Sequence, residues 1–225
     1  MGKLYLVPTP IGNLEDITFR AIKVLKNADL ILVEDSRRSS KLLSHYGINK
    51  PIQKYHSFNE HRKINSFISE LKKEKSIVLI SDAGTPSISD PGFLLVRESI
   101  KNEIEIECLP GATALIPALV QSGFPNERFV FEGFLPIRKG RKKRLEEIEQ
   151  DPRTIIIYES PHRIIKTLKD LLNVFSEDRM IAISREMTKI YEETYRGSIN
   201  NALHHFKKQS PKGEFVICIS GKSKI

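Results

Sequence analysis

The chain has 225 residues, of which 40% are hydrophobic and 28% charged, a balance typical of a folded globular protein and not of a disordered or fibrous one. No apolar run is long enough to span a membrane, and Pro8 and Pro10 interrupt the run that begins at Leu4, so we expect neither a membrane protein nor a secretory leader. The net charge of +8 favours an anionic partner such as RNA. Cys108 and Cys218 lie far apart in strand-like runs, and both are expected to be buried, reduced thiols in a cytoplasmic protein.

The first half of the chain alternates short apolar strands with helices. Strands are predicted from β-branched and aliphatic runs at residues 4–7, 30–33, 52–55, 77–80 and 104–109. Helices are predicted after them from their apolar spacing, at residues 18–26, 39–47, 64–71, 93–100 and 115–120. Five β/α units in succession predict an α/β fold with a mostly parallel sheet and helices on both faces.

The sequence changes in character after residues 122–126, so we predict two domains, 1–121 and 122–225. Further strands are expected at residues 128–131, 154–158, 180–184 and 214–219, with helices at 139–149, 164–175 and from 198 onward. Because no helix separates residues 192–196 from the strand before them, this segment is expected to pair with it in an antiparallel manner. The second domain is therefore predicted to have a mixed sheet.

Four loops follow strands of the first half, and parallel strands would bring them to one edge of the sheet. They are Pro8–Asn13, Glu34–Arg37, Ser81–Gly92 and Pro110–Thr113. The third is about twice as long as an ordinary connection of two to six residues, and its glycines and prolines make it stiff. Ligands bind outside the carboxyl ends of strands in open α/β sheets, so a rigid ligand pocket is predicted here. For Asp90-Pro-Gly92 a plain helix N-cap is an equal alternative.

Common nucleotide and metal motifs are absent from the sequence. There is no G-x-G-x-x-G, Walker A, G-x-S-x-G or H-E-x-x-H pattern. The spacing of His45, His56 and His61 is too irregular for a zinc site, so no metal is expected. His204 and His205 lie on a polar helix and are predicted to be solvated.

A basic run, Arg138–Arg144, has six basic residues in seven. Three glutamates behind it, at positions 146, 147 and 149, offer a simple alternative in which the charges balance along a solvated helix. Because the run follows a loop that carries Phe134 and Pro136, an arm that follows RNA phosphates is favoured.

Motifs along nearly the whole chain match a known family. They are Leu6–Leu14, Glu34–Arg37, Ser81–Pro86, Ile88–Gly92, Leu109–Gly111, Phe131–Pro136, Tyr158–Arg163 and Arg185–Lys189. On these motifs the chain resembles the tetrapyrrole methylase superfamily, and within it the branch that 2′-O-methylates a decoding-centre cytidine of 16S ribosomal RNA. The sequence departs from this branch in two ways: Ser36 stands where Thr is frequent, and the further C-terminal domain of longer members is lacking.

The resemblance implies a two-domain, tetrapyrrole-methylase-like fold with S-adenosylmethionine in the cleft between the domains. It also implies a cytoplasmic homodimer that acts on ribosomal RNA in the assembled small subunit. Carried over by position, the cofactor contacts are Ile11, Thr85, Ile88, Ala112, Thr113, Tyr158 and Glu214. Structural alternatives stand beside three of them: Ile88 as a core residue, Thr113 as a helix cap and Tyr158 as a packing residue.

A carboxylate near the cofactor is expected to accept the proton of the ribose hydroxyl, which is a poor nucleophile at neutral pH. The candidates are Glu34, Asp35, Glu60, Glu159 and Glu186. Glu159 and Glu186 each neighbour an arginine, so they could equally position RNA or lock the fold. Glu34 and Asp35 are favoured, with an ion pair between Asp35 and Arg37 as the alternative. Glu60 is set aside because Ser57-Phe-Asn-Glu60 matches a helix capping box. Expected substrate contacts are Arg37, His56, Asn59, Arg138, Lys139, Arg141, Lys142, Arg144, His162 and Arg163.

Two alternatives to an RNA 2′-O-methyltransferase remain open. One is a methylase of the same fold that acts on a small tetrapyrrole, which the basic run and the Tyr158–Arg163 motif disfavour. The other is a ribosome assembly factor that binds RNA without turnover, which the intact loops disfavour. Methyl transfer to small ribosomal subunits distinguishes the three.

Overall fold

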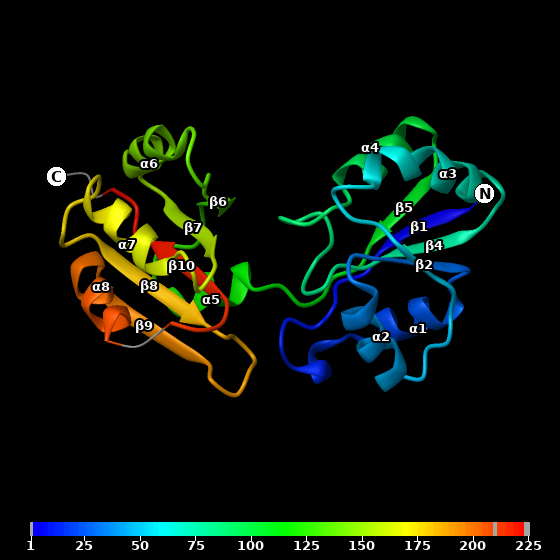
Figure 1. Ribbon diagram of the computed structural model, residues 1–225, viewed down its shortest axis with the longest axis horizontal. Helices are drawn as coiled ribbons and strands as arrows, with labels where there is room; N and C mark the ends of the chain where they lie inside the picture. The colour runs from blue at the N-terminus through cyan, green and yellow to red at the C-terminus, as the bar shows by residue number, and fades with distance from the viewer. Residues whose placement is uncertain (1, 209–210, 223–225) are drawn as a thin grey trace. The chain divides into compact units, whose positions relative to one another are not determined.

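The computed structural model describes residues 2–208 and 211–222, and the chain divides into two compact units, residues 1–113 and 114–225 (Figure 1). Each unit consists of a sheet with helices packed on it and has a hydrophobic core of its own. Among the described residues, no helix has both the length and the apolar character needed to cross a membrane.

The described part of the first unit forms a parallel five-stranded sheet, as predicted. In the order β3-β2-β4-β1-β5, its strands are Ile52–Lys54, Leu30–Val33, Ser76–Leu79, Lys3–Leu6 and Glu105–Cys108. Its helices are η1 (Leu14–Asp16), α1 (Phe19–Asn27), α2 (Ser36–His45), α3 (Glu60–Lys72) and α4 (Phe93–Lys101).

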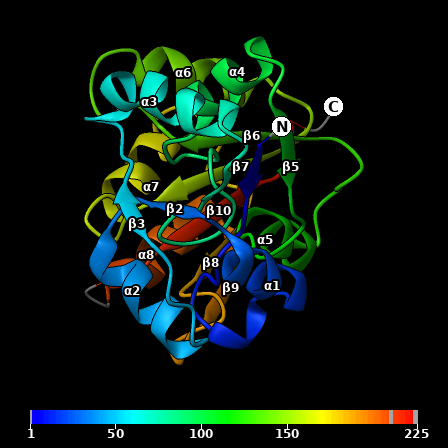
Figure 2. The same ribbon diagram turned by 90° about the vertical axis from the view of Figure 1, so that its right-hand side faces the viewer.

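Helices cover both faces of this sheet, with α1 and α2 on one face and α3 and α4 on the other (Figure 2). The alternation of side chains along the strands explains the two cores. In β4, Ile77 packs in the cluster that contains Phe67 of α3, whereas its neighbour Val78 packs in the cluster that contains Leu25 of α1. Burial on both faces is the reason that these strands are continuous apolar runs.

The neighbouring strands β1 and β4 mark a topological switch point. β1 is followed by α1 on one face of the sheet, and β4 is followed by α4 on the other. Their two loops therefore leave the sheet side by side at its carboxyl edge, the place where open α/β sheets bind ligands.

The second unit has a mixed sheet in its described residues, again as predicted. In the order β6-β7-β10-β8-β9, the strands are Phe129–Phe134, Thr154–Glu159, Phe215–Ile219, Met180–Arg185 and Glu193–Ser198. β6 and β7 are parallel and the other neighbours antiparallel, including the predicted pairing of β8 with β9. The helices are α5 (Leu115–Ser122), α6 (Arg141–Glu149), α7 (Ile164–Leu172) and α8 (Ile199–Lys207).

One apolar face of this second sheet packs against α6, α7 and α8, with Ile155 and Ile157 of β7 in the cluster. Helix α5 packs against β10 and β8, and Arg196 of β9 donates to the carbonyl of Gln121 at 2.9 Å. The boundary between the compact units therefore falls before α5, whereas the predicted domain limits, 1–121 and 122–225, fall after it.

Three local predictions from the sequence were wrong. Cys108 is exposed, because β5 is an edge strand, while Cys218 in the central strand β10 is buried as expected. His205 is only partly exposed: its Nε2 lies 2.6 Å from a carboxylate oxygen of Glu193, while His204 is exposed. Strand β6 continues to Phe134, into a stretch predicted as a loop, with a register shift between Phe131 and Gly133.

Candidate functional site

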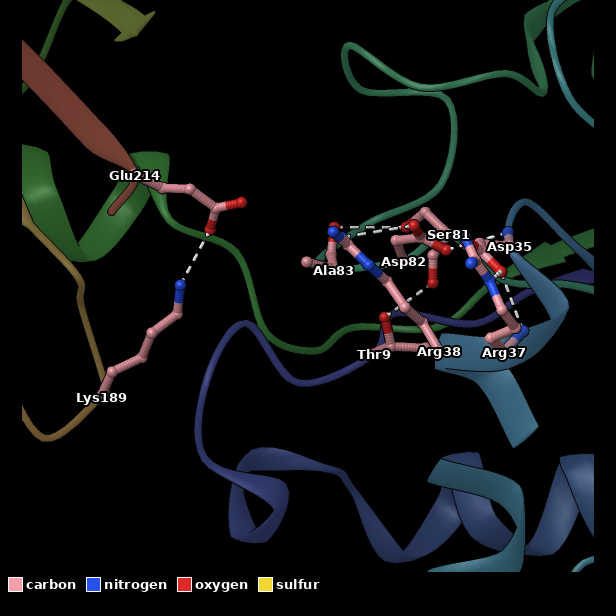
Figure 3. A network of polar contacts seen from close by, with 9 residues as sticks. All are labelled: Thr9, Asp35, Arg37, Arg38, Ser81, Asp82, Ala83, Lys189 and Glu214. Carbon is pink, nitrogen blue, oxygen red and sulfur yellow. Dashed lines mark hydrogen bonds and ion pairs between the residues drawn. The ribbon is translucent and has the colours of Figure 1, made fainter. Parts of the chain in front are cut away.

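The loops after β1 and β4 are joined by backbone hydrogen bonds. The Thr9 N–H donates to the Gly84 carbonyl and the Gly84 N–H to the Thr9 carbonyl, both at 2.9 Å. The Thr9 hydroxyl donates to the carbonyl of Ser81 at 3.1 Å, and the Ser81 hydroxyl donates to that of Ala83 at 3.3 Å (Figure 3). Because Thr9 and Ser81 are buried, these bonds hold the two loops in one geometry.

The loop after β5 packs against both of them. A Cβ atom on Gly111 would lie 2.7 Å from Cβ of Pro8, so the close approach of these loops requires glycine. The Thr85 hydroxyl donates to the carbonyl of Ala112 at 3.4 Å. The structure thus brings together three segments in the first unit that carry the expected cofactor contacts Ile11, Thr85, Ile88, Ala112 and Thr113.

Two structural alternatives for these residues do not hold. Ile88 is 40% exposed and is not a core residue. The N-cap of α5 is Ala114, so Thr113 does not cap that helix. Similarly, α4 begins after Gly92 and not after Asp90, so the N-cap interpretation of Asp90 was wrong.

The β4–α4 loop contains strained backbone. Ser87 and Ser89 adopt left-handed φ angles of 72° and 62°, which cost energy in residues other than glycine. The Ser87 hydroxyl is buried and has no hydrogen-bond partner among the described residues. Strained residues gather at functional sites. This loop is also the longest of the four strand-end loops that were predicted to line a ligand pocket.

Glu34, at the end of β2, lies half-buried beside Asp82 of the β4–α4 loop. Burial raises its pKa above the ordinary value, and the negative charge of Asp82 raises it further. Asp82 is itself held in place: its Oδ1 accepts the Asp35 N–H at 3.1 Å, and its Oδ2 lies 3.4 Å from the guanidinium of Arg38 (Figure 3). A carboxylate with a raised pKa is suited to accept a proton.

Asp35 has a different environment. It is the N-cap of α2, and its Oδ1 accepts the backbone N–H of Arg37 at 2.9 Å. The Arg37 guanidinium donates to its Oδ2 at 2.8 Å (Figure 3). These bonds to Arg37 hold the pKa of Asp35 well below its usual range. The ion pair kept open as an alternative is present, and Asp35 is a weak base.

Asn59 fixes the orientation of the His56 ring. Its Oδ1 accepts the His56 backbone N–H at 3.0 Å, and its Nδ2 donates to the carbonyl of Lys54 at 3.2 Å. These backbone partners fix which end of the amide is the donor, so Nδ2, which lies 3.2 Å from His56 Nε2, donates to it. The proton of the neutral ring is therefore on Nδ1, which is buried with no partner in the described part of the chain. Asn59 is buried and its amide group is bonded to these partners, so its role is to position His56 and not to contact a substrate.

The capping box predicted at Ser57 is absent. Helix α3 begins at Glu60 with Asn59 as its N-cap and no side-chain cap bond. The Glu60 carboxylate instead accepts the hydroxyl of the buried Tyr55 at 3.3 Å. Glu60 thus has a structural partner other than the one expected from the sequence.

In the second unit, Lys189 connects two acidic residues. Its Nζ donates to Glu186 Oε1 at 2.7 Å and to Glu214 Oε2 at 3.1 Å (Figure 3). Burial alone would lower the pKa of Lys189, but the bonds to both carboxylates raise it. Glu214 directly precedes β10, which pairs with β7 and its Tyr158, so one expected cofactor contact of this unit lies on β7 and the other at the start of the neighbouring strand. Sequence reasoning missed Lys189, because its partner Glu214 is distant along the chain.

Glu159, a candidate base, is buried in a structural network. Its carboxylate accepts the Thr167 hydroxyl at 2.6 Å, the Ser160 N–H at 2.8 Å and the Arg163 Nη2 at 3.2 Å. Arg163 also donates to the carbonyl of Leu135 at 2.9 Å. With these partners Glu159 and Arg163 lock the fold, which was the alternative to a role in RNA binding.

Arg141 belongs to the same network. Only 7% exposed, it donates to Asp170 at 2.7 Å, to the Thr167 hydroxyl at 2.8 Å and to the carbonyl of Pro136 at 3.0 Å. Its position explains the burial, because Arg141, Leu145 and Ile148 lie on one face of α6. A guanidinium that is buried and bonded to three partners is not accessible to a phosphate, and the helical spacing is the sequence signal that could have shown this.

The rest of the basic run is more accessible. Arg138, Lys139, Lys142 and Lys143 are exposed, whereas Arg144 forms short ion pairs with Glu132 and Glu147. The pair of Lys142 with Glu146 spans 3.7 Å and that of Lys143 with Glu147 spans 4.0 Å, so charge balancing along the helix is present but weak. His162 and Arg37 are also exposed.

A protein-family model and several known proteins are similar to this chain over most of its length. The family model described as Tetrapyrrole (Corrin/Porphyrin) Methylases matches residues 3–203. A protein of Thermotoga maritima named ribosomal RNA small subunit methyltransferase I is 46% identical over 222 residues, which cover 99% of this chain and 100% of that protein. A protein of the same name from Haemophilus influenzae is 50% identical over 227 residues, which cover 99% and 80%.

Solved structures agree with the fold. A cobalt precorrin-4 methyltransferase superposes with a TM-score of 0.72 at 18% identity, covering 97% of this chain and 94% of that one. Uroporphyrin-III C-methyl transferase from Thermus thermophilus, complexed with S-adenyl homocysteine, has a TM-score of 0.66 at 19% identity, covering 96% and 97%. At these identities the similarity concerns the α/β architecture with its parallel and mixed sheets.

Proposed function

Because the chain belongs to the family of tetrapyrrole (corrin/porphyrin) methylases, we propose that it is an S-adenosylmethionine-dependent methyltransferase of small-subunit ribosomal RNA. The observation that carries the proposal is the near full-length likeness to relatives that bear this name, at 46% and 50% identity. In its finer form, the proposal is methylation of the 2′-hydroxyl of a decoding-centre cytidine in the assembled subunit by a homodimer.

The residues present suit S-adenosylmethionine. Three loops of the first unit are fixed against one another through Thr9, Gly84 and Gly111, so their backbone groups form a fixed surface at a switch point of the sheet. We assign cofactor contacts to Ile11, Thr85, Ile88, Ala112 and Thr113 in this unit and to Tyr158 and Glu214 in the second. When bound, the cofactor supplies an activated methyl group on a sulfonium.

The proposed role of Glu34 is to accept the ribose proton. A ribose hydroxyl attacks poorly at neutral pH, and a carboxylate oxygen of Glu34 can take its proton as the oxygen becomes a nucleophile. The raised pKa of Glu34, caused first by burial and then by Asp82, makes it a stronger base than Asp35. Asp35 then has the role of orienting α2 and Arg37.

RNA contacts are assigned mainly to exposed side chains. In the first unit these are the exposed Arg37 and the partly buried His56, the latter positioned by Asn59. In the second unit they are Arg138, Lys139, Lys142 and His162. Arg144 is not assigned an RNA contact, because Glu132 and Glu147 balance its single charge. Arg141 and Arg163 are left out, because neither is exposed and both guanidinium groups bond to partners inside the unit.

A transfer assay with alternative acceptors tests the class of substrate. Purified protein and labelled S-adenosylmethionine are incubated with small ribosomal subunits that lack the modification, with deproteinised RNA, and with uroporphyrinogen III. We expect label on RNA of the subunits only. Label on the tetrapyrrole would favour the alternative suggested by the solved structures, and cofactor binding without any transfer would favour an assembly factor.

A further inference from the structure

The second unit exposes apolar and basic side chains together between β6 and α6. We call this the β6–α6 surface and define it by Phe134, Ile137, Arg138, Lys139 and Lys143. Phe134 is 51% exposed and Ile137 is 66% exposed. Single exposed apolar residues are ordinary on protein surfaces, so the distinguishing feature here is that two of them lie next to a strongly basic segment.

A hollow adjoins this surface. It has a volume of about 400 Å³, and both Phe134 and Lys143 are among the residues that line it, together with Pro136 and Arg144. The volume lies within the range of small-ligand pockets, and one nucleotide is a ligand of that size. The hollow therefore places an aromatic residue and a cation within reach of a single bound group.

The loop that carries this surface is fixed from behind. Arg163 donates to the carbonyl of Leu135 at 2.9 Å and Arg141 donates to that of Pro136 at 3.0 Å, and both guanidiniums are anchored by carboxylates. The Phe134 ring lies edge-on to Tyr158, with centroids 5.8 Å apart. The aromatic ring is thus held in place before any ligand arrives, which lowers the entropy cost of binding.

The charge of the surface is positive where it is exposed. Within the described chain, the side chains of Arg138 and Lys139 form no ion pair, and that of Lys143 lies 4.0 Å from Glu147 while 82% exposed. Glu132 and Glu147 also line the hollow, and Arg144 and Lys143 balance their two charges, so the positive excess of the surface comes from Arg138 and Lys139. An exposed aromatic ring with unbalanced cations around it is the combination that binds single-stranded nucleic acid.

We infer that the β6–α6 surface is a binding site for one unpaired nucleotide of the RNA substrate, whose base stacks on Phe134 while Arg138, Lys139 and Lys143 hold the flanking phosphates. This inference rests on the proposed function and specifies which part of the RNA the second unit recognises: a single-stranded segment. A protein partner would not require the cations, and a duplex would not expose a base to the ring.

The test measures the affinity of the full chain for a fluorescent oligocytidine of about ten nucleotides, at several salt concentrations. Phe134→Ala should weaken binding by about tenfold and leave the slope of log affinity against log salt unchanged, since stacking releases no counterions. Phe134→Trp should retain the affinity, whereas Phe134→Leu, which is apolar but not flat, should bind as weakly as the alanine variant. Lys143→Ala should lower the slope by about 0.7.

Several results would overturn the inference. These are absence of wild-type binding at low salt, full affinity in Phe134→Leu, or a loss in Phe134→Ala that is accompanied by a lower melting temperature. A Phe134→Ala variant that keeps its affinity but forms smaller assemblies would identify the surface as an interface between copies. If Phe134 proves necessary for RNA binding but wild-type protein transfers no methyl to small subunits, the proposed function fails and the binding site stands.

Discussion

At the scale of single residues, Glu34 has the surroundings best suited to proton transfer. Its pKa in the folded protein lies above the ordinary value, mainly through burial and then through Asp82, so the base is fully ionised only above that pKa. The single-turnover rate should therefore rise with pH through a range above the usual titration of glutamate. Glu34→Gln should be about a hundredfold slower at neutral pH and should lose this dependence.

The stability of the same variant provides a control. A raised pKa means that the ionised carboxylate is disfavoured by folding, and any stability gained from its protonated form is lost as pH rises through that pKa. At neutral pH Glu34→Gln should consequently be as stable as wild type or more stable in urea unfolding. A slow variant that is also unstable, or one with the wild-type rate, would argue against Glu34 as the base.

Asn59 is predicted to set the tautomer of His56. Nitrogen NMR of the imidazole should show protonated Nδ1 and bare Nε2 in wild-type protein at a pH where the ring is neutral, because Nε2 accepts from the Asn59 amide. Asn59→Ala should release this preference and weaken RNA binding while cofactor affinity stays constant. A proton on Nε2 in the wild type would contradict the assignment.

At the scale of elements, α6 combines two kinds of basic residue. Arg141 and its partners Asp170 and Thr167 form what we call the clamp. Arg141→Ala should lower the free energy of unfolding by about 3 kcal/mol, because it leaves the Asp170 carboxylate and the buried Thr167 without this partner. Lys142→Ala, in which an 86% exposed side chain is removed, should change stability by less than about 0.5 kcal/mol and should instead weaken RNA binding. Equal stability of the two variants in urea would show that the clamp is not needed.

The packing of the β5 loop against the β1 loop gives another prediction. Gly111→Ala places a Cβ against Pro8 and should lower stability by about 1–3 kcal/mol or separate the loops. Either outcome should weaken binding of S-adenosylhomocysteine in calorimetry. Pro110→Ala, a change at the exposed neighbouring residue, serves as the matched control and should bind as wild type. Unchanged binding by Gly111→Ala would remove this loop from the cofactor site.

At the scale of the whole molecule, local patterns were sufficient to predict the strands, the helices and the parallel and mixed character of the sheets. The position of the strand-end loops at one edge of the sheet was also predictable, because parallel strands bring these loops to the same edge whatever the order of the strands. Contacts distant along the chain were not predictable: Lys189 with Glu214, or Thr9 with Gly84, depend on packing that no local pattern contains. Arg141 and Lys142 are neighbouring basic residues that look alike in the sequence. They differ in the face of α6 on which they lie, which buries Arg141 and leaves Lys142 exposed.

The most direct measurement of the central claim is the chemical position of the transferred methyl group. Small subunits that lack the modification are incubated with labelled S-adenosylmethionine and the protein, and their RNA is then hydrolysed in alkali. A 2′-O-methyl group protects the adjacent phosphodiester bond, because hydrolysis needs the free 2′-hydroxyl. We predict that the label is recovered in one alkali-resistant dinucleotide that begins with cytidine, and that Glu34→Gln reduces it. Label in mononucleotides, which would mean methylation of a base, or no label in RNA, would contradict the account.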